Sequence, residues 1–166
     1  MPLRISAKVP RDGSRYFREK IEPQLDEQIR YVGELKDPDK EQFLGGATAL
    51  LFPIEWPEPF GLVMIEAMAC GTPVIAFRRG SVPEVVEHGT AGFIVGNEAE
   101  AIEALSWIDR LDRHQVRQVF ERRFITRRMT DDYLRIYHEL INPAQDKPAA
   151  VPATRRERLA EHVEYR

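Results

Sequence analysis

Residues 47–77 read ATALLFPIEWPEPFGLVMIEAMACGTPVIAF, and this stretch decides the fold. It opens with the apolar run ATALLFP, which predicts a buried strand, and continues through a proline-rich loop from Pro53 to Pro59. An apolar helix is predicted from about Phe60 to Ala69, ended by Gly71, and Pro73–Phe77 is the next strand. A strand, a helix and a second strand in succession predict a right-handed crossover between parallel strands.

The same alternation continues on both sides of this stretch. We expect further strands at Leu3–Ala7, Ile29–Val32 and Ala91–Val95, and further helices at Ser14–Gln28, Asp37–Gly45, Gly80–Glu87, Glu98–Asp109 and Thr126–Leu140. The pattern predicts an α/β fold in which a Rossmann-like parallel sheet is flanked by helices. Residues 1–142 are expected to form one domain. The proline- and alanine-rich residues 143–166 are expected to form a flexible tail with a frayed helix near TRRERLAEHVEYR.

The composition is that of an ordinary globular protein. The 166 residues are 43% hydrophobic and 31% charged, and 24 Lys and Arg against 27 Asp and Glu give a net charge of −3, which argues against a nucleic-acid partner. The single cysteine, Cys70, predicts a reducing, cytoplasmic compartment and a packing role rather than a reactive one. The apolar run 47–54 is too short to span a membrane, and the start MPLRISAKVP has no signal-peptide pattern, so we expect the chain to begin inside a larger fold.

Ligands of an open parallel sheet bind beyond the carboxyl ends of its strands. Four loops qualify on this ground: Lys8–Gly13, Gly33–Lys36, Pro53–Gly61 and Arg78–Pro83. The third is the strongest candidate, because it leads into a helix whose first amides, around Gly61 and Leu62, lack partners inside the helix and suit an anion such as a diphosphate.

Two glutamates mark this helix, with seven residues between them. Glu66 interrupts the apolar sequence MIEAMA, where a buried carboxylate needs a partner; a ribose hydroxyl pair is one, and a backbone group or an arginine of the fold is another. Glu58 precedes the helix, where it either contacts a ligand or only complements the helix dipole. The residues alone leave both pairs of alternatives open.

The run EPFGLVMIEAMACGTPVIAFRRGSVPEVVEHGTAGFIV resembles the defining segment of family-4 retaining glycosyltransferases, whose hallmark is this pair of glutamates. The resemblance extends upstream through IRYVGEL and downstream through RRFITRRMTDDYLRIYHEL, and so covers about residues 3–140. It implies the donor-binding C-terminal half of a GT-B fold, slightly truncated at its N-terminus.

The resemblance also implies roles for single residues. Glu58 is the catalytic glutamate, which would contact hydroxyls of the donor sugar and orient the anomeric carbon. Glu66 would bind both ribose hydroxyls, and the backbone of Phe60, Gly61 and Leu62 would hold the distal phosphate and the sugar.

Two other loops complete the implied donor site. Gly80 and Ser81 stand where relatives often have two glycines, so sugar selectivity is expected to differ there. Gly33, Glu34 and Leu35 lie where the family places its base-binding backbone. The donor is expected to be a nucleotide diphosphate sugar such as a UDP-, GDP- or ADP-hexose, with a base that these residues do not specify.

The implied chemistry is metal-independent transfer with retention, without any cofactor. The four histidines, His88, His114, His138 and His162, show no ligand spacing. The family's acceptor-binding N-terminal domain and its pair of phosphate-binding cations lie outside this sequence. Lys8 would supply one cation to the diphosphate or stand as a solvated loop lysine. We therefore expect very weak transfer by the chain alone.

The helix Thr126–Leu140 resembles the terminal helix that crosses back onto the acceptor domain. Its apolar residues recur at helical spacing and predict a stripe that docks on the missing domain or on another copy of the chain: Met129, Tyr133, Ile136, Tyr137 and Leu140. The nearby arginines are expected to form a solvated face, the alternative being a patch at the inner surface of the membrane: Arg113, Arg117, Arg122, Arg123, Arg127 and Arg128.

Two functions from different classes follow. The first is a hexosyltransferase present as its donor-binding half. The second is a non-catalytic nucleotide-sugar-binding or interaction module that needs a separate chain to supply the acceptor domain. A nucleotide-sugar epimerase half of similar fold is disfavoured by the spacing of Glu58 and Glu66.

Overall fold

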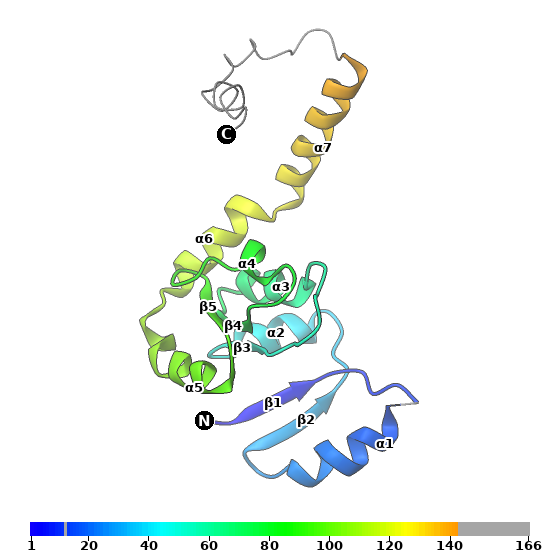
Figure 1. The fold of residues 1–166 in the computed structure, drawn as a ribbon, viewed down its shortest axis with the longest axis vertical. Helices are drawn as coiled ribbons and strands as arrows, with labels where there is room; N and C mark the ends of the chain where they lie inside the picture. Colours follow the sequence, from blue (N-terminus) through cyan, green and yellow to red (C-terminus); the bar gives the residue numbers. More distant parts are fainter. Residues whose placement is uncertain (12, 143–166) are drawn as a thin grey trace, which may run out of the picture. The chain divides into compact units, whose positions relative to one another are not determined.

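The structure is a computed structural model that describes residues 1–11 and 13–142 (Figure 1). Residues Met1–Arg123 form one compact unit, and a second unit begins at Phe124. The domain expected over residues 1–142 therefore comprises a compact unit and a helix outside it. The expected tail, residues 143–166, and its frayed helix lie outside the described residues.

Five parallel strands confirm the α/β architecture, but they divide between two sheets rather than one. Strand β1 (Leu3–Ser6) pairs with β2 (Ile29–Gly33), and β3 (Leu50–Phe52), β4 (Val74–Phe77) and β5 (Gly92–Val95) form the second sheet in that order. Among the described residues, no strand joins the two sheets. Strand β3 is consequently an edge strand with Leu51 exposed, and the prediction that it is buried was wrong.

The first sheet has little cover. Its crossover runs through α1 (Ser14–Tyr16), a π-helical turn (Phe17–Ile21) and a 3₁₀ turn (Glu22–Gln24), and Phe17 packs on Tyr31 with ring centroids 4.7 Å apart. None of the described residues among 1–36 is buried. The helix ends before the predicted Gln28, because the carboxylate of Asp26 accepts the backbone N–H groups of Gln28 and Ile29 and turns the chain into β2.

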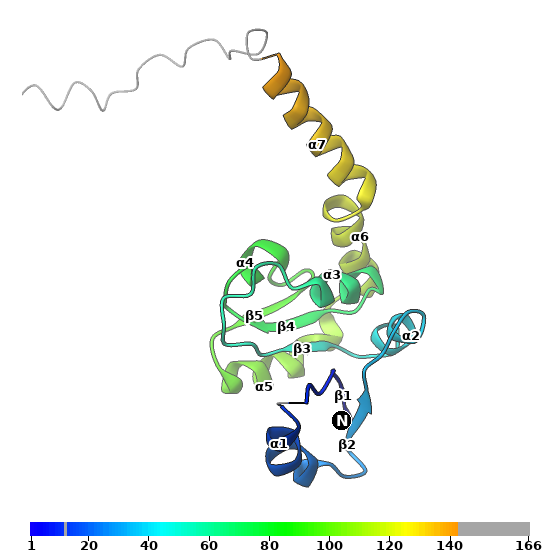
Figure 2. The same ribbon diagram turned by 90° about the vertical axis from the view of Figure 1, so that its right-hand side faces the viewer.

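The core surrounds the second sheet. Every residue of β4 is buried, and helix α5 (Glu98–Trp107) covers the face that carries Ile75 and Phe77. Helices α3 (Leu62–Ala69) and α6 (Arg113–Arg123) lie on the other side (Figure 2), where Met64, Met68, Val116 and Val119 are fully buried. Helix α2 (Asp39–Gly45) contacts α3, and the short helix α4 (Val82–Val85) follows β4.

Helix α6 presents arginines to the carboxyl ends of three other helices. Arg113 donates to Gly45 O at 2.8 Å, at the end of α2, and also to Ala47 O and Thr72 Oγ1. Arg117 donates to Ala69 O, the last carbonyl of α3. Arg123 likewise donates to the last carbonyl of α4.

Arg113 and Arg117 are exposed, as the prediction of a solvated arginine face requires, but the prediction did not include their hydrogen bonds to carbonyls, and Arg123 is half-buried. The last carbonyls of a helix have no partner inside it, and a guanidinium group supplies both N–H donors and a positive charge that suits this end of the helix dipole. Of the arginines on α6, Arg122 stays closest to the prediction, with a side chain that is 59% exposed and paired with Glu87.

The second unit contributes α7 (Thr126–Ile141). The predicted apolar stripe is exposed on this helix, from Met129 through Tyr133 and Tyr137 to Leu140. Association through the stripe stays a prediction. None of the helices in the described part of the chain is both long and apolar enough to cross a membrane.

The capping arrangement predicts that Arg113→Ala destabilises the chain. Removing the guanidinium leaves four acceptors without this donor, the carbonyls of Gly45, Ala47 and Cys70 and the Thr72 hydroxyl, so we expect the free energy of unfolding to fall by about 2 kcal/mol. Urea denaturation followed by circular dichroism measures it. Arg122→Ala is the matched control, because its exposed pair with Glu87 is expected to contribute less than about 1 kcal/mol. Equal midpoints for the two variants would contradict a capping role.

Candidate functional site

The candidate site is built where the loops after β3 and β4 meet. The second loop approaches the first so closely that a Cβ atom on Gly80 would lie 2.3 Å from Glu58 O, and Gly80 has a φ of +48°. The backbone N–H of Ser81 donates to the same carbonyl at 2.9 Å. Only glycine satisfies both the backbone angle and the close approach. The structure therefore brings Glu58, Gly80 and Ser81 together, at the carboxyl ends of neighbouring parallel strands.

The Glu58 carboxylate accepts two hydrogen bonds from residues of its own loop. Its Oε2 accepts the indole N–H of Trp56 at 3.0 Å, and its Oε1 accepts the backbone N–H of Gly61 at 3.2 Å. Gly61 is left-handed, with a φ of +73°, and directly precedes α3. The expectation that the Gly61 amide is open to an anion was wrong, because this amide is already bonded to Glu58. The first amides available to a ligand begin at Leu62.

Glu58 thus lies at the start of α3 with a side chain that accepts two hydrogen bonds from its own loop. A carboxylate offers about four acceptor positions, and two are used here. Glu58 can therefore retain its loop contacts and still accept hydrogen bonds from hydroxyl groups of a ligand.

Glu66, on α3, is paired with Lys40 of α2. The Lys40 Nζ lies 2.6 Å from Glu66 Oε1, and each side chain is 34% exposed. The hydrogen bond from Lys40 to Glu66 raises the pKa of Lys40 above its ordinary value, although partial burial of the ammonium group acts in the opposite direction. Asp37 adds a weaker contact to Lys40 at 3.5 Å.

Sequence reasoning required a partner for Glu66 but did not find Lys40. Predicting this pair requires the knowledge that α2 packs on α3, and the sequence of neither helix reveals that contact. Because Lys40 bonds to Oε1, the other carboxylate oxygen has no hydrogen-bond partner among the described residues and can accept hydroxyl groups.

Ser81 holds an unsatisfied polar atom at the junction of the two loops. The residue is 7% exposed, and its Oγ is buried without a hydrogen-bond partner among the described residues. A buried hydroxyl without a partner costs about 1–3 kcal/mol. The position is therefore suited to a ligand atom that supplies the missing hydrogen bond.

The remaining predicted residues form a separate group. Gly33 lies at the end of β2, where its carbonyl accepts the N–H of Ala7 at 3.2 Å and the hydroxyl of Ser6 at 3.0 Å. Lys8, Glu34 and Leu35 flank this point, and no hydrogen bond joins them to Glu58 or Ser81 in the part of the chain described here. Phe60 and Leu62 are exposed, next to the group formed by Glu58, Gly80 and Ser81.

Two hollows lie elsewhere on the compact unit. One of about 280 Å³ is lined by residues that include Ala47, Ile108 and Arg113, and one of about 610 Å³ lies between α2 and Cys70. Neither includes Glu58, Glu66 or Gly80. Within residues 1–11 and 13–142, no cluster of His, Cys, Asp and Glu side chains could hold a metal ion.

Comparisons with known proteins agree with this architecture. The family model "Glycosyl transferases group 1" matches residues 14–118, and the chain belongs to this family. It is 30% identical over 131 residues to N-acetyl-alpha-D-glucosaminyl L-malate synthase of Bacillus anthracis, covering 68% of this chain and 34% of that protein. It is 44% identical over 80 residues to alpha-maltose-1-phosphate synthase of Mycolicibacterium smegmatis, covering 46% of this chain and 20% of that protein.

Solved structures share the fold. The Anabaena protein HepE in complex with UDP and glucose aligns with a TM-score of 0.68 and 22% identity, over 83% of this chain and 40% of that one. A glycosyltransferase from Rickettsia africae aligns with a TM-score of 0.72 and 22% identity, over 85% and 40%. The chain thus spans less than half the length of these structures, and about a third or less of the two curated relatives.

The pair between Lys40 and Glu66 predicts a pH-dependent coupling. A double-mutant cycle with Lys40→Met and Glu66→Gln should give a coupling of about 0.5–1 kcal/mol near neutral pH, measured by urea denaturation. The pKa of Lys40 is higher in the folded chain than its ordinary value of 10.5. The contribution of the Lys40–Glu66 pair to the free energy of unfolding is therefore complete below that value and is lost as the pH rises through the pKa of Lys40 in the folded chain. A coupling that stays constant to strongly alkaline pH would contradict this.

Proposed function

We propose that the chain is the donor-binding half of a retaining, metal-independent glycosyltransferase and that it binds a nucleoside diphosphate hexose. The observation that carries the proposal is the junction of Glu58, Gly80 and Ser81 at the start of α3, where acceptors and a buried hydroxyl converge. Membership of the glycosyl transferase family supports the reaction class. The UDP and glucose named for the HepE structure support a uridine nucleotide as the first ligand to test.

Each group then has a role in donor binding. Glu66, oriented by Lys40, accepts the two ribose hydroxyls through its remaining acceptor positions. Glu58 accepts hydroxyls of the sugar and orients the anomeric carbon. The backbone at Phe60, Gly61 and Leu62 holds the distal phosphate and the sugar. The amide of Leu62 is the donor there, since that of Gly61 stays with Glu58.

The other predicted residues complete the proposed donor-binding site. Ser81 Oγ donates to the sugar or to the distal phosphate and so gains the partner it lacks, while Gly80 keeps the backbone close. Gly33, Glu34 and Leu35 contact the base through their backbone. Lys8, which is exposed after β1, supplies a cation to the diphosphate.

The chain alone is proposed to bind its donor but to transfer sugar very weakly. Glycosyl transfer needs an enclosed site that positions both reactants and stabilises the leaving diphosphate. Here Trp56, Phe60 and Leu62 beside the first group of site residues are all exposed. An acceptor-binding domain, on the same or another chain, would cover them and complete the site.

A non-catalytic nucleotide-sugar-binding module is the second candidate. The observation that favours it is the exposure of Trp56, Phe60 and Leu62 near Glu58, because the described residues could bind a donor without enclosing it. Slow transfer by the chain alone that Glu58→Ala abolishes would support the first candidate, whereas donor binding without any transfer by the chain alone would support the second.

The donor site predicts a specific pattern of thermal stabilisation. A ligand that binds only the folded state raises Tm, so UDP, GDP, ADP and their hexose conjugates are compared on the purified chain. We expect one base to stabilise selectively. Glu66→Ala should abolish stabilisation by the bare nucleotide, whereas Glu58→Ala should abolish only the additional stabilisation by the sugar conjugate.

Glu103→Ala is the matched control, because it removes a glutamate from an exposed position on α5, outside the site. Its ligand response should equal that of the wild type. If no nucleotide stabilises the wild-type chain, the donor-site proposal fails. If Glu66→Ala responds like the wild type, the ribose assignment fails while the rest stands.

A further inference from the structure

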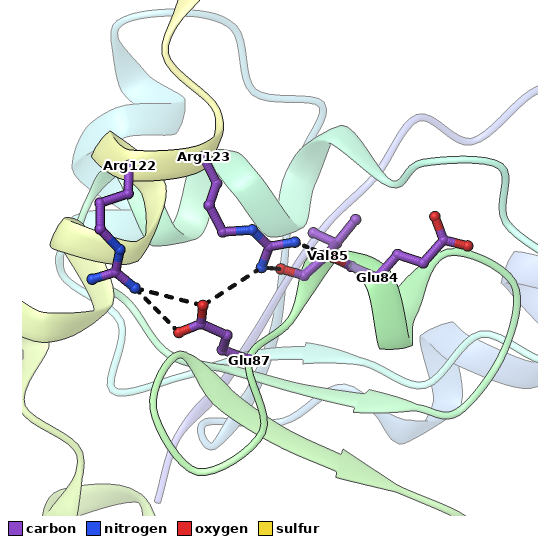
Figure 3. A network of polar contacts seen from close by, with 5 residues as sticks. All are labelled: Glu84, Val85, Glu87, Arg122 and Arg123. Atoms are coloured by element: carbon purple, nitrogen blue, oxygen red, sulfur yellow. Dashed lines mark hydrogen bonds and ion pairs between the residues drawn. The ribbon is translucent and has the colours of Figure 1, made fainter. Parts of the chain in front are cut away.

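A network of polar contacts links the end of α6 to α4 (Figure 3). Arg123 Nη1 donates to Val85 O at 3.2 Å, and its Nη2 donates to Glu84 O. The same guanidinium group lies 4.0 Å from the Glu87 carboxylate, which Arg122 contacts at 3.4 Å from the other side. Arg123 is thus held between a carboxylate and two carbonyls of one helix.

Helix α4 is a short, tightly packed link. Val82 and Val85 inside it, and Val86 directly after it, are each at most 2% exposed. The Ser81 carbonyl accepts the N–H groups of Glu84 at 2.9 Å and Val85 at 3.0 Å. The carbonyls bound by Arg123 and the turn at Ser81 therefore belong to one rigid hydrogen-bonded unit. A helix this short forms few internal bonds of its own, so its position depends on contacts at both ends.

The other end of this unit fixes the Glu58 loop. The Ser81 N–H bonds to Glu58 O, and Gly80 fits against the same peptide with no room for a Cβ atom. A shift of α4 would therefore move the backbone of Glu58 or break its bond to Ser81. The path from Arg123 to Glu58 runs entirely through contacts within the compact unit Met1–Arg123.

We propose that Arg123 is a positioning residue for the sugar end of the donor site: by binding the carboxyl end of α4, it fixes the Ser81 turn and, through that turn, the Glu58 loop. The inference rests on the proposed function for its consequence in sugar recognition. Glu87 orients the guanidinium group, while Arg122 adds a surface ion pair to Glu87 and, within the described part of the chain, no hydrogen bond to α4. Lys40 and Glu66, which hold the ribose end, lie outside this path.

The first measurement is amide hydrogen exchange on the full chain without ligand. In Arg123→Ala the Ser81 amide should exchange at least about tenfold faster than in the wild type, relative to the Val74 and Arg78 amides that bond across the second sheet. Arg122→Ala should leave this ratio unchanged. Val116→Ala, which opens a buried position on the same helix, should lower Tm and accelerate all three amides together.

Arg123→Lys keeps the charge but offers one nitrogen in place of two, and it serves if the alanine variant does not fold. Its Ser81 amide should also exchange faster than the reference amides. Unchanged relative exchange at Ser81 in the folded Arg123 variants overturns the inference, whether or not the chain binds any nucleotide.

The second measurement compares the dissociation constants of UDP and UDP-glucose by calorimetry. Arg123→Ala should reduce the preference for UDP-glucose over UDP by about tenfold, equivalent to about 1.4 kcal/mol, and leave UDP affinity unchanged. Val116→Ala should not alter this preference. An equal loss of both affinities, or an unchanged preference, overturns the positioning role. If the wild type binds neither ligand, the failure belongs to the proposed function with these ligands, and the exchange result still decides whether Arg123 fixes the loop.

Discussion

Guanidinium groups on α6 bind the final carbonyls of α2, α3 and α4, and the rest of the compact unit depends on this interaction. A helix end buried against protein must find donors for its last carbonyls, and short helices such as α4 have few internal bonds to compensate if it does not. Arg113, Arg117 and Arg123 satisfy three such ends from a single helix, while Val116 and Val119 bury the side of that helix that faces the core. One element therefore combines apolar packing with electrostatic capping.

The same arrangement explains why the candidate site lies where it does. In a parallel sheet the helices begin at the carboxyl ends of the strands, so α3 and α4 begin in the loops that contain Glu58 and Ser81. Their far ends are fixed by α6, and their near ends are available to a ligand. The donor site proposed for this glycosyl transferase family member thus lies at the starts of helices whose opposite ends are held by α6. Lys40 provides a comparable lateral support for Glu66.

Sequence patterns predicted the strands and helices well wherever an apolar run is bounded by glycine or proline, as in residues 62–77. They predicted less well wherever the outcome depends on a tertiary neighbour. Strand β3 is apolar in sequence, yet it is exposed because it lies at a sheet edge. The Gly61 amide is unpaired in an isolated helix, but the preceding loop brings Glu58 to it. Lys40 was not identified because its pairing arises from the packing of two helices, and the α6 arginines resemble a solvated face until the carbonyls they bind are known.

The sparse cover on the sheet of β1 and β2 has a thermodynamic consequence. With no buried residue among those described in 1–36, this segment gains little hydrophobic free energy from folding, and its opening costs much less than unfolding of the core around β4. The backbone at Gly33–Leu35 belongs to this segment, whereas Glu58 and Glu66 belong to the well-packed part. Affinity for the base would then include the free energy of ordering a weakly held segment, and affinity for the ribose and the sugar would not. A contact that covers this sheet would strengthen nucleotide binding without touching the nucleotide.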